Sequence, residues 1–206
     1  MNAGRAAVGL DVSRETRERL ERYFELLKKW NPAINLVAKS TIEEAWTRHF
    51  IDSAQIFDLA PAGAKHWADL GSGGGFPGLV VATLAAGRAS AMKTTLVESD
   101  RRKAAFLRTV ARELDIVVEV IAERIEDVPP LRADVVSARA LAPLSVLLDF
   151  AERHLVPGGT GLFMKGAAYE RELTDALASW RFDVQKIPSR TDRDAVILSI
   201  GGLARA

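Results

Sequence analysis

The sequence of 206 residues contains no cysteine, and this absence removes several kinds of chemistry. Disulfide bonds, thiolate metal sites and a cysteine nucleophile are all excluded. The three histidines, His49, His66 and His154, lie far apart, and no two have the spacing of metal ligands. We therefore expect no metal. No serine lies in a G-x-S-x-G motif, so the nucleophile of a typical α/β hydrolase is also missing.

Long apolar runs and excess charge are lacking as well. No segment is apolar over the length that a membrane span needs, and residues 1–11 lack the basic start and apolar run of a signal peptide. We therefore expect a cytoplasmic protein without membrane contact. Lys and Arg number 28 and Asp and Glu 27, a net charge of +1. A dedicated nucleic-acid binder is usually more basic, so any such contact should be a local basic face.

The most informative stretch is residues 66–78, HWADLGSGGGFPG. Residues 66–70 predict a short strand, and residues 79–86 predict a helix that ends at Gly87. Pro77 suits the first turn of this helix, where its missing N–H costs nothing. Glycines between a strand and a helix allow positive φ angles and let the backbone lie against a bound nucleotide. The stretch therefore indicates a nucleotide-like ligand.

Two registers fit these glycines. Gly73-x-Gly75-x-x-Gly78 matches the dinucleotide fingerprint, whereas Gly71-x-Gly73-x-Gly75 matches the looser loop of S-adenosylmethionine-dependent methyltransferases. Asp69, at the strand end, would oppose a pyrophosphate and favour a cation. S-adenosylmethionine carries an ammonium, a sulfonium and no phosphate, so Asp69 favours the methyl donor over NAD. A structural turn without a ligand is the third interpretation.

Two helices are expected before the first strand. Apolar residues at helical spacing predict one helix from the cap Ser13 to about Trp30, ending before Pro32. A second helix is expected from Thr41 to just before Pro61, with Trp30 and Trp46 in the core. Residues 1–12 are expected to form a loose terminus. We expect residues 1–62 to pack as a helical extension on the core.

From residue 66 the chain alternates between strands and helices. We expect strands over residues 66–70, 94–98, 116–121, 133–138, 160–165, 182–187 and 195–200, and helices over residues 79–86, 101–114, 144–154 and 169–179. A polar turn joins the last two strands, which predicts an antiparallel pair. Residues 63–206 are thus expected to form an α/β domain with a Rossmann-like, mostly parallel seven-stranded sheet and helices on both faces.

Ligands bind at the carboxyl ends of the strands in such sheets. Glu98 ends the second strand, where a carboxylate can accept both ribose hydroxyls of a nucleoside. After the third strand, Ile125 and Glu126 are candidates for holding an adenine. Arg139 ends the fourth strand and Lys165 the fifth, and both cations suit a base edge or a phosphate. For each of these side chains, an ordinary solvated surface position is the alternative.

His49 and Asp52 are three residues apart on the second expected helix and share a face. We interpret this pair as a core or capping feature.

The chain resembles a known family from about Tyr23 to Lys165. It is similar to the bacterial small-subunit ribosomal RNA guanine-N7 methyltransferases, methyltransferase G, also called glucose-inhibited division protein B. The matching segments are Lys29-Trp30-Asn31-x-x-x-Asn35-Leu36, Arg48-His49-x-x-Asp52-Ser53, residues 69–78 with their Phe-Pro-Gly ending, residues 98–107, and Ser137-Ala138-Arg139-Ala140. The family often has an Arg-His pair at the last strand, where Arg193-Asp194-Ala195 stands here.

The resemblance implies the class I S-adenosylmethionine-dependent methyltransferase fold. It also implies methyl transfer to N7 of guanine 527 in the 530 loop of 16S ribosomal RNA, with that RNA or a small-subunit precursor as partner. We expect a monomer. The motif and the resemblance together predict these cofactor-binding residues: Asp69, Gly71, Gly73, Gly75 and Phe76 in or beside the glycine loop; Glu98 and Ser99 at the ribose; Ile125 and Glu126 at the adenine; and Arg139 near the reacting centre.

Guanine N7 has an in-plane lone pair and no proton, so its methylation needs no general base. We therefore expect the catalytic side chains to be cations that hold the target base or its phosphate. Arg139 is the first candidate and Lys165 the second. Three other classes stay open: a small-molecule or protein methyltransferase, a non-catalytic RNA-binding module, and an NAD oxidoreductase.

Overall fold

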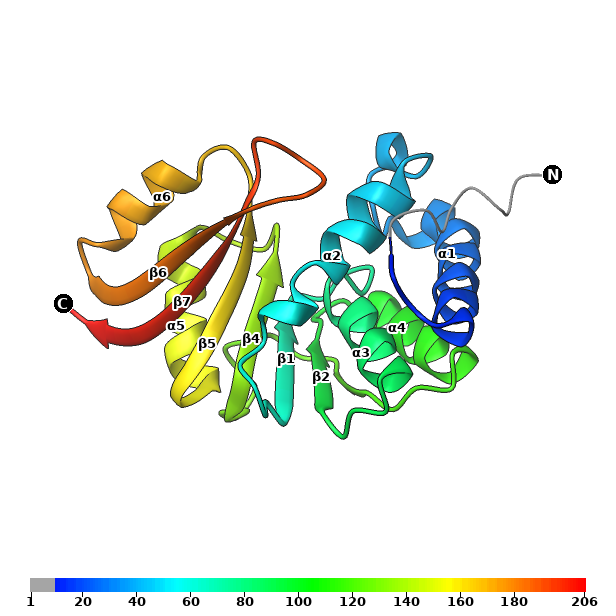
Figure 1. Cartoon of the computed structure of the whole chain (residues 1–206), viewed down its shortest axis with the longest axis horizontal. Helices are drawn as coiled ribbons and strands as arrows, with labels where there is room; N and C mark the ends of the chain where they lie inside the picture. Colours follow the sequence, from blue (N-terminus) through cyan, green and yellow to red (C-terminus); the bar gives the residue numbers. More distant parts are fainter. Residues whose placement is uncertain (1–9) are drawn as a thin grey trace.

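The sheet has the strand order β3-β2-β1-β4-β5-β7-β6 in a computed structural model that describes residues 10–206 (Figure 1). Its strands are β1 (His66–Leu70), β2 (Lys93–Val97), β3 (Glu119–Ile121), β4 (Ala133–Arg139), β5 (Leu155–Lys165), β6 (Trp180–Pro188) and β7 (Val196–Arg205). Strands β1 to β5 pair in parallel, and β7 lies antiparallel between β5 and β6. The expected seven-stranded sheet with its final antiparallel pair is confirmed.

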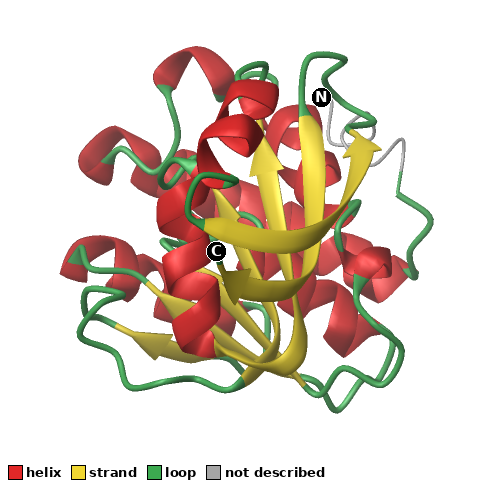
Figure 2. Cartoon of the chain, turned by 90° about the vertical axis from the view of Figure 1, so that its left-hand side faces the viewer, coloured by secondary structure: helices red, strands yellow, loops and turns green. Residues whose placement is uncertain are grey.

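Helices cover both faces of this twisted sheet, as Figure 2 shows. They are α1 (Arg14–Ile34), α2 (Asp52–Ala54), α3 (Gly78–Gly87), α4 (Arg101–Glu113), α5 (Leu144–His154) and α6 (Tyr169–Ala176). Because side chains alternate along a strand, Trp67 of β1 packs with Val81 of α3, whereas Leu70 packs with Leu147 of α5. Helix α1 packs on α3 and α4, on the same face as Trp67.

The first helix is longer than predicted. Ser13 caps it as expected, since its hydroxyl accepts from the Thr16 N–H at 3.2 Å. The helix then passes through Pro32 and ends at Asn35, which has a φ of 50° and donates to the Asn31 carbonyl. The predicted end before Pro32 was wrong because the proline lies in the last turn, where it removes a single backbone hydrogen bond.

The second predicted helix was wrong as a continuous element. The structure has short segments instead: η2 (Lys39–Thr41), the π-helix η3 (Trp46–Ile51), which runs directly into α2, and η4 (Phe57–Leu59). The apolar residues are buried as expected, and the rings of Trp46 and Phe50 stack at 5.0 Å. The segment is held by contacts outside a regular helix: Nε2 of His49 lies 3.0 Å from the Thr41 hydroxyl, and Asp52 accepts from the distant Thr191 hydroxyl at 2.7 Å.

Several helices and strands begin or end at other residues than predicted. Strand β3 begins later than expected because Asp115 has a φ of 50° and the Ile116 N–H donates back to Ala111 of α4. Helix α3 begins at Gly78, so Pro77 precedes it instead of lying in its first turn. Strand β7 continues to Arg205, and α6 ends at Ala176.

The leading segment packs closely on the α/β part. An ion pair of 2.6 Å joins Arg22 of α1 to Glu113 of α4. A domain division at residue 62 stays a prediction, and most of the expected loose terminus, residues 1–9, lies outside the described part of the chain. Among residues 10–206, no helix is long and apolar enough to cross a membrane.

Candidate functional site

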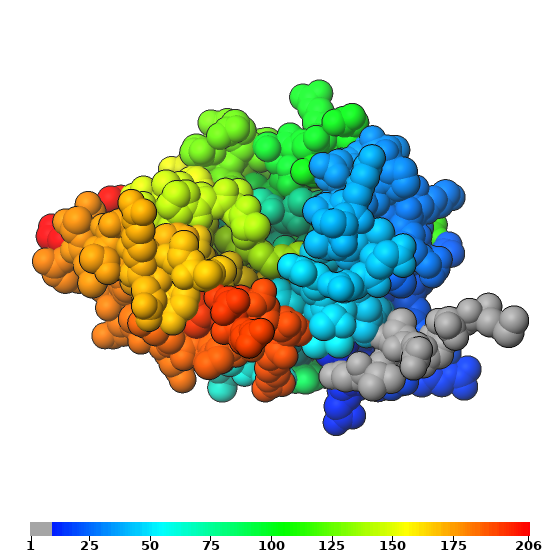
Figure 3. All heavy atoms as spheres, turned by 90° about the horizontal axis from the view of Figure 1, so that it is seen from above, coloured from blue at the N-terminus to red at the C-terminus, as the bar shows by residue number. Residues whose placement is uncertain are grey.

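A cavity of about 1640 Å³ opens at the carboxyl ends of β1, β2, β4 and β5. From above, Figure 3 shows the molecule hollowed between the cyan residues of the leading segment and the yellow to orange C-terminal residues. A pocket for one small molecule typically measures about 300–1000 Å³. This cavity therefore has room for a second ligand beside the first.

Most of the predicted site residues come together on the wall of this cavity. These are Gly71, Gly73, Phe76, Glu98, Ser99, Ile125, Glu126, Arg139 and Lys165. Asp69 and Gly75 are not on the wall; they lie behind it and support the glycine loop.

Asp69 is fully buried, and its carboxylate is bonded within the protein. It accepts from the Ser137 hydroxyl at 2.7 Å and from the Gly78 N–H at 3.2 Å. It thus ties β1 to β4 and to the start of α3. The argument that Asp69 faces a ligand's charge is not supported by this placement, and its part in cofactor binding stays a prediction.

Burial raises the pKa of Asp69 to about 6, although hydrogen bonds from Ser137, Ser72 and Gly78 act in the opposite direction. The folded protein therefore keeps a proton that the unfolded chain releases near 3.8. Between about pH 4 and 6 the folded state binds more protons, so the contribution of Asp69 to the unfolding free energy falls as pH rises.

We expect wild type to lose roughly 2 kcal/mol of unfolding free energy relative to Asp69→Asn as pH rises from about 4 to 6.5. The measurement is urea unfolding of both proteins across this range, with the exposed Asp58→Asn as the control. A difference that does not change with pH would contradict the assignment.

The glycine loop is clamped by the leading helix. The Tyr23 hydroxyl of α1 donates to the Gly74 carbonyl, and its ring stacks on Phe76 at 5.3 Å. Burial raises the pKa of Tyr23 well above its ordinary value, so the hydroxyl stays protonated and can act as a donor. The N-terminal extension thus shapes the cavity wall directly.

Glu98 lies at the loop, and the residue is 8% exposed. One oxygen accepts from the Gly73 N–H at 2.8 Å and the other from the Asp100 N–H at 2.8 Å. Both carboxylate oxygens keep free lone pairs. Glu98 is therefore fixed next to the loop with acceptor capacity left for hydroxyl groups of a ligand.

The segment after β3 forms the adjacent wall. Ile125 is buried, and its carbonyl is within 3.2 Å of Nε2 of His154. Glu126 is exposed and pairs with Arg124 at 3.3 Å. An apolar side chain on a fixed backbone suits the face of an aromatic ring, as the prediction for the adenine requires.

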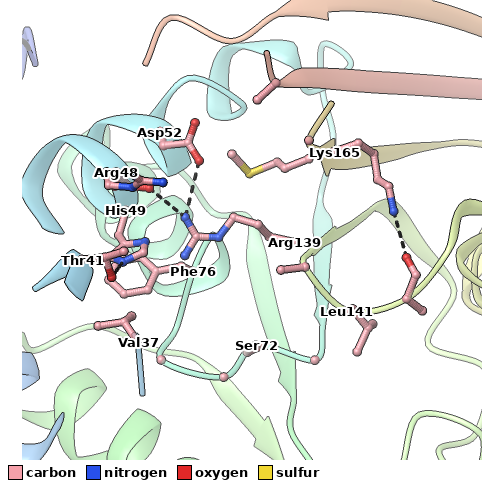
Figure 4. A pocket seen from close by; sticks show the side chains of 18 of the residues that line it. Val37, Thr41, Arg48, His49, Asp52, Ser72, Phe76, Arg139, Leu141 and Lys165 are labelled. Carbon is pink, nitrogen blue, oxygen red and sulfur yellow. Dashed lines mark hydrogen bonds and ion pairs between the residues drawn. The ribbon is translucent and has the colours of Figure 1, made fainter. Parts of the chain in front are cut away.

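Arg139 projects into the middle of the cavity, as Figure 4 shows. Its guanidinium donates to the Arg48 carbonyl at 3.2 Å and pairs with Asp52 at 3.4 Å. It also lies over the Phe76 ring, 5.1 Å from its centroid. Burial lowers the pKa of Arg139, but an arginine remains charged at every physiological pH. The site therefore holds a largely desolvated positive charge.

Lys165 also lines the cavity but is engaged elsewhere. Its ammonium pairs with Glu172 of α6 at 2.6 Å and donates to the Ala142 carbonyl at 2.9 Å. Glu172 in turn accepts from the Leu144 N–H at the start of α5. These bonds fit a role in joining β5 to two helices, so Arg139 is the better placed of the two cations.

His49 and Asp52 were underrated by sequence reasoning, which interpreted them as core or capping residues. Both line the cavity. Burial, with the charges of Arg139 and Arg48, lowers the pKa of His49 to about 4, so the ring is neutral at physiological pH. The signal was the Arg48-His49-x-x-Asp52 spacing, which carried the resemblance but was given no role.

Within residues 10–206, no group of three or more His, Asp or Glu side chains is arranged to hold a metal ion.

Several solved methyltransferases share this fold. A ribosomal protein L11 methylase from Lactobacillus delbrueckii subsp. bulgaricus matches with a TM-score of 0.58 at 18% identity, covering 80% of this chain and 79% of that one. A tRNA (m1A58) methyltransferase from Aquifex aeolicus matches with a TM-score of 0.53 at 13% identity, covering 74% and 67%. The fold is thus that of the class I methyltransferases.

The sequence comparisons define the family. The rRNA small subunit methyltransferase G family matches residues 16–196. A ribosomal RNA small subunit methyltransferase G from Ruegeria sp. (strain TM1040) is 53% identical over 205 residues, 100% of both chains. The protein of that name from Ruegeria pomeroyi is 56% identical and covers 95% of this chain and 96% of its own. The chain belongs to the rRNA small subunit methyltransferase G family.

Proposed function

We propose that this protein transfers a methyl group from S-adenosylmethionine to N7 of guanine 527 in 16S ribosomal RNA. The observation that carries the proposal is the cavity itself, in a chain of this family. It joins a glycine loop and Glu98 on one side to the buried cation Arg139 on the other. The acceptor is 16S RNA or a small-subunit precursor in the cytoplasm, and the enzyme acts as a monomer.

The residues present fit the methyl donor. S-adenosylmethionine supplies an electrophilic methyl group on a sulfonium. The free lone pairs of Glu98 suit the ribose hydroxyls, Ser99 lies beside them, and Ile125 suits one face of the adenine. An added Cβ at Gly73 would meet nothing closer than 3.8 Å, so the glycine leaves the backbone open to a ligand there, while Gly71 makes room for the Leu141 side chain.

We expect Glu98→Ala to raise the dissociation constant for S-adenosylmethionine about 30-fold, because charge-assisted hydrogen bonds to the ribose are lost. RNA affinity should change far less. Calorimetric titration measures the first and a filter-binding assay the second. Glu113→Ala, which removes an exposed carboxylate from α4, is the control. Unchanged cofactor affinity in Glu98→Ala would refute the ribose role.

The acceptor chemistry explains why the site needs a cation and no base. The N7 lone pair attacks the methyl carbon, and the C–S bond breaks, which leaves the purine positively charged and the sulfur neutral. The protein's work is to align N7, carbon and sulfur. Arg139 must leave N7 free, so its donors suit O6 of the guanine or a backbone phosphate. Access to N7 requires the base to leave its stack.

The acceptor is tested by offering several substrates with labelled S-adenosylmethionine. We expect label in 16S RNA or in small-subunit particles, and none in 23S RNA or in ribosomal proteins. Transfer to a protein or small molecule alone would indicate another methyltransferase, and cofactor binding without any transfer would indicate a different acceptor. Absence of cofactor binding would indicate a non-catalytic RNA-binding module.

A further inference from the structure

Asp52 connects three parts of the chain that are distant in sequence. One carboxylate oxygen accepts from the Gln55 amide at 2.7 Å, from the Thr191 hydroxyl at 2.7 Å and from the Ser189 hydroxyl at 3.2 Å. The other oxygen faces Arg139 at 3.4 Å (Figure 4). The two oxygens of the carboxylate therefore have different partners: Oδ1 binds the loop after β6, and Oδ2 binds the cation at the end of β4.

The loop that Asp52 holds, residues 189–195, joins β6 to β7 and borders the cavity. Gln55 fixes it at a further point, because its amide oxygen accepts from the Arg190 N–H at 2.9 Å. Residues 191–195 line the cavity, Arg193 among them. In Figure 3 the orange-red residues of this loop lie beside the cyan residues of the leading segment. The loop is thus placed to meet whatever occupies the acceptor side.

We propose that Asp52 is a positioning residue that holds Arg139 and the 189–195 loop together as the RNA-facing side of the cavity. This inference rests on the proposed function and deepens it. In this role Asp52 acts through its bonds to Arg139 and to the loop.

The burial of the pair gives this contact its importance. The side chains of Asp52 and Arg139 are 16% and 17% exposed, so little solvent screens their charges. The guanidinium also donates to the Arg48 carbonyl and lies over the Phe76 ring, and neither of these groups carries a charge. Without the carboxylate, the fork of donors is free to turn away from the position that an incoming guanine requires.

Two variants separate the two functions of the carboxylate. Asp52→Asn keeps a carbonyl oxygen for the hydroxyls of Ser189 and Thr191 but removes the charge that faces Arg139. The double variant Ser189→Ala, Thr191→Val removes the two hydroxyl bonds from the loop to Asp52 and leaves the charge in place, while the bond from the Arg190 N–H to Gln55 remains. Asp58→Asn is the matched control, because Asp58 is exposed on the same leading segment and pairs with Arg88 at 2.8 Å, away from the cavity.

The experiment measures kcat and KM for methyl transfer to small-subunit RNA, with S-adenosylmethionine affinity and melting temperature alongside. We expect Asp52→Asn to lower kcat about 30-fold with cofactor affinity within about twofold of wild type. The loop variant should raise the KM for RNA about fivefold with kcat nearly unchanged. In the Arg139→Ala background, Asp52→Asn should cause no further loss, since the two residues act as one unit.

Several outcomes would overturn the inference. They are wild-type kcat in Asp52→Asn, losses that multiply when Asp52→Asn is combined with Arg139→Ala, or an unchanged KM in the loop variant. If Asp52→Asn does not fold, the KM of the loop variant decides alone. A wild-type protein that binds the cofactor but methylates no RNA would instead contradict the proposed function, so the two failures are distinguishable.

Discussion

Replacing Arg139 by alanine is expected to lower the rate of methyl transfer to small-subunit RNA about 100-fold, because the cavity loses a desolvated fork of hydrogen-bond donors. The guanidinium lies between Asp52 and the Phe76 ring, central to the space that the acceptor would enter. Affinity for S-adenosylmethionine should fall much less than the rate. Single-turnover kinetics with labelled donor measure the effect separately from product release.

Arg139→Lys and Arg88→Ala complete this experiment. Lysine keeps the charge but not the planar fork, so we expect an intermediate rate. Arg88 is exposed and pairs with Asp58, and its removal should leave the rate unchanged. Full turnover by Arg139→Ala would show that the cation does not hold the acceptor, and Lys165 would then be the remaining candidate.

Gly75→Ala is expected to destabilise the protein strongly. Gly75 has a φ of +93°, and a Cβ there would clash with the Tyr23 hydroxyl and lie 2.5 Å from Cδ1 of Leu79. Backbone strain and overpacking together should cost about 3 kcal/mol. For a chain of this length, that lowers the melting temperature by roughly 6–12 °C.

Gly63→Ala is the matched control for this prediction. Gly63 has a φ of +81°, but nothing lies within 4 Å of an added Cβ. Gly63→Ala therefore measures the cost of backbone strain alone, about 1 kcal/mol of unfolding free energy. Scanning calorimetry of both variants compares them. Equal melting temperatures would show that close packing of Tyr23 and Leu79 against Gly75 adds no cost to the backbone strain.

The parts of the fold that follow from local pattern were predicted well. Strand β1 and helix α5 have the expected bounds, because an apolar strand before glycines and an amphipathic run between prolines are local signals. The second helix was not predicted correctly. Its apolar spacing indicated which residues are buried, but the bonds of Asp52 to a distant loop are tertiary contacts that spacing along the chain does not show.

Contacts between distant elements also limited the prediction of the site. Sequence reasoning found that Glu98 and Arg139 lie at strand ends, and both line the cavity. It did not find that Asp69 faces Ser137, that Lys165 faces Glu172, or that Asp52 faces Arg139. Each of these partners belongs to another element. Spacing along the chain locates a charged residue, whereas only the tertiary structure shows whether its charge is free or already paired.

The most direct test of the central claim maps the methylated atom. Small-subunit RNA is incubated with the protein and S-adenosylmethionine, cleaved chemically at 7-methylguanine and read by primer extension. We predict a single stop that reports guanine 527, absent when the donor is omitted and reduced with Arg139→Ala. Modification at another guanine would contradict the account. So would a protein that binds the donor but leaves both free RNA and small-subunit particles without any chemically cleavable 7-methylguanine.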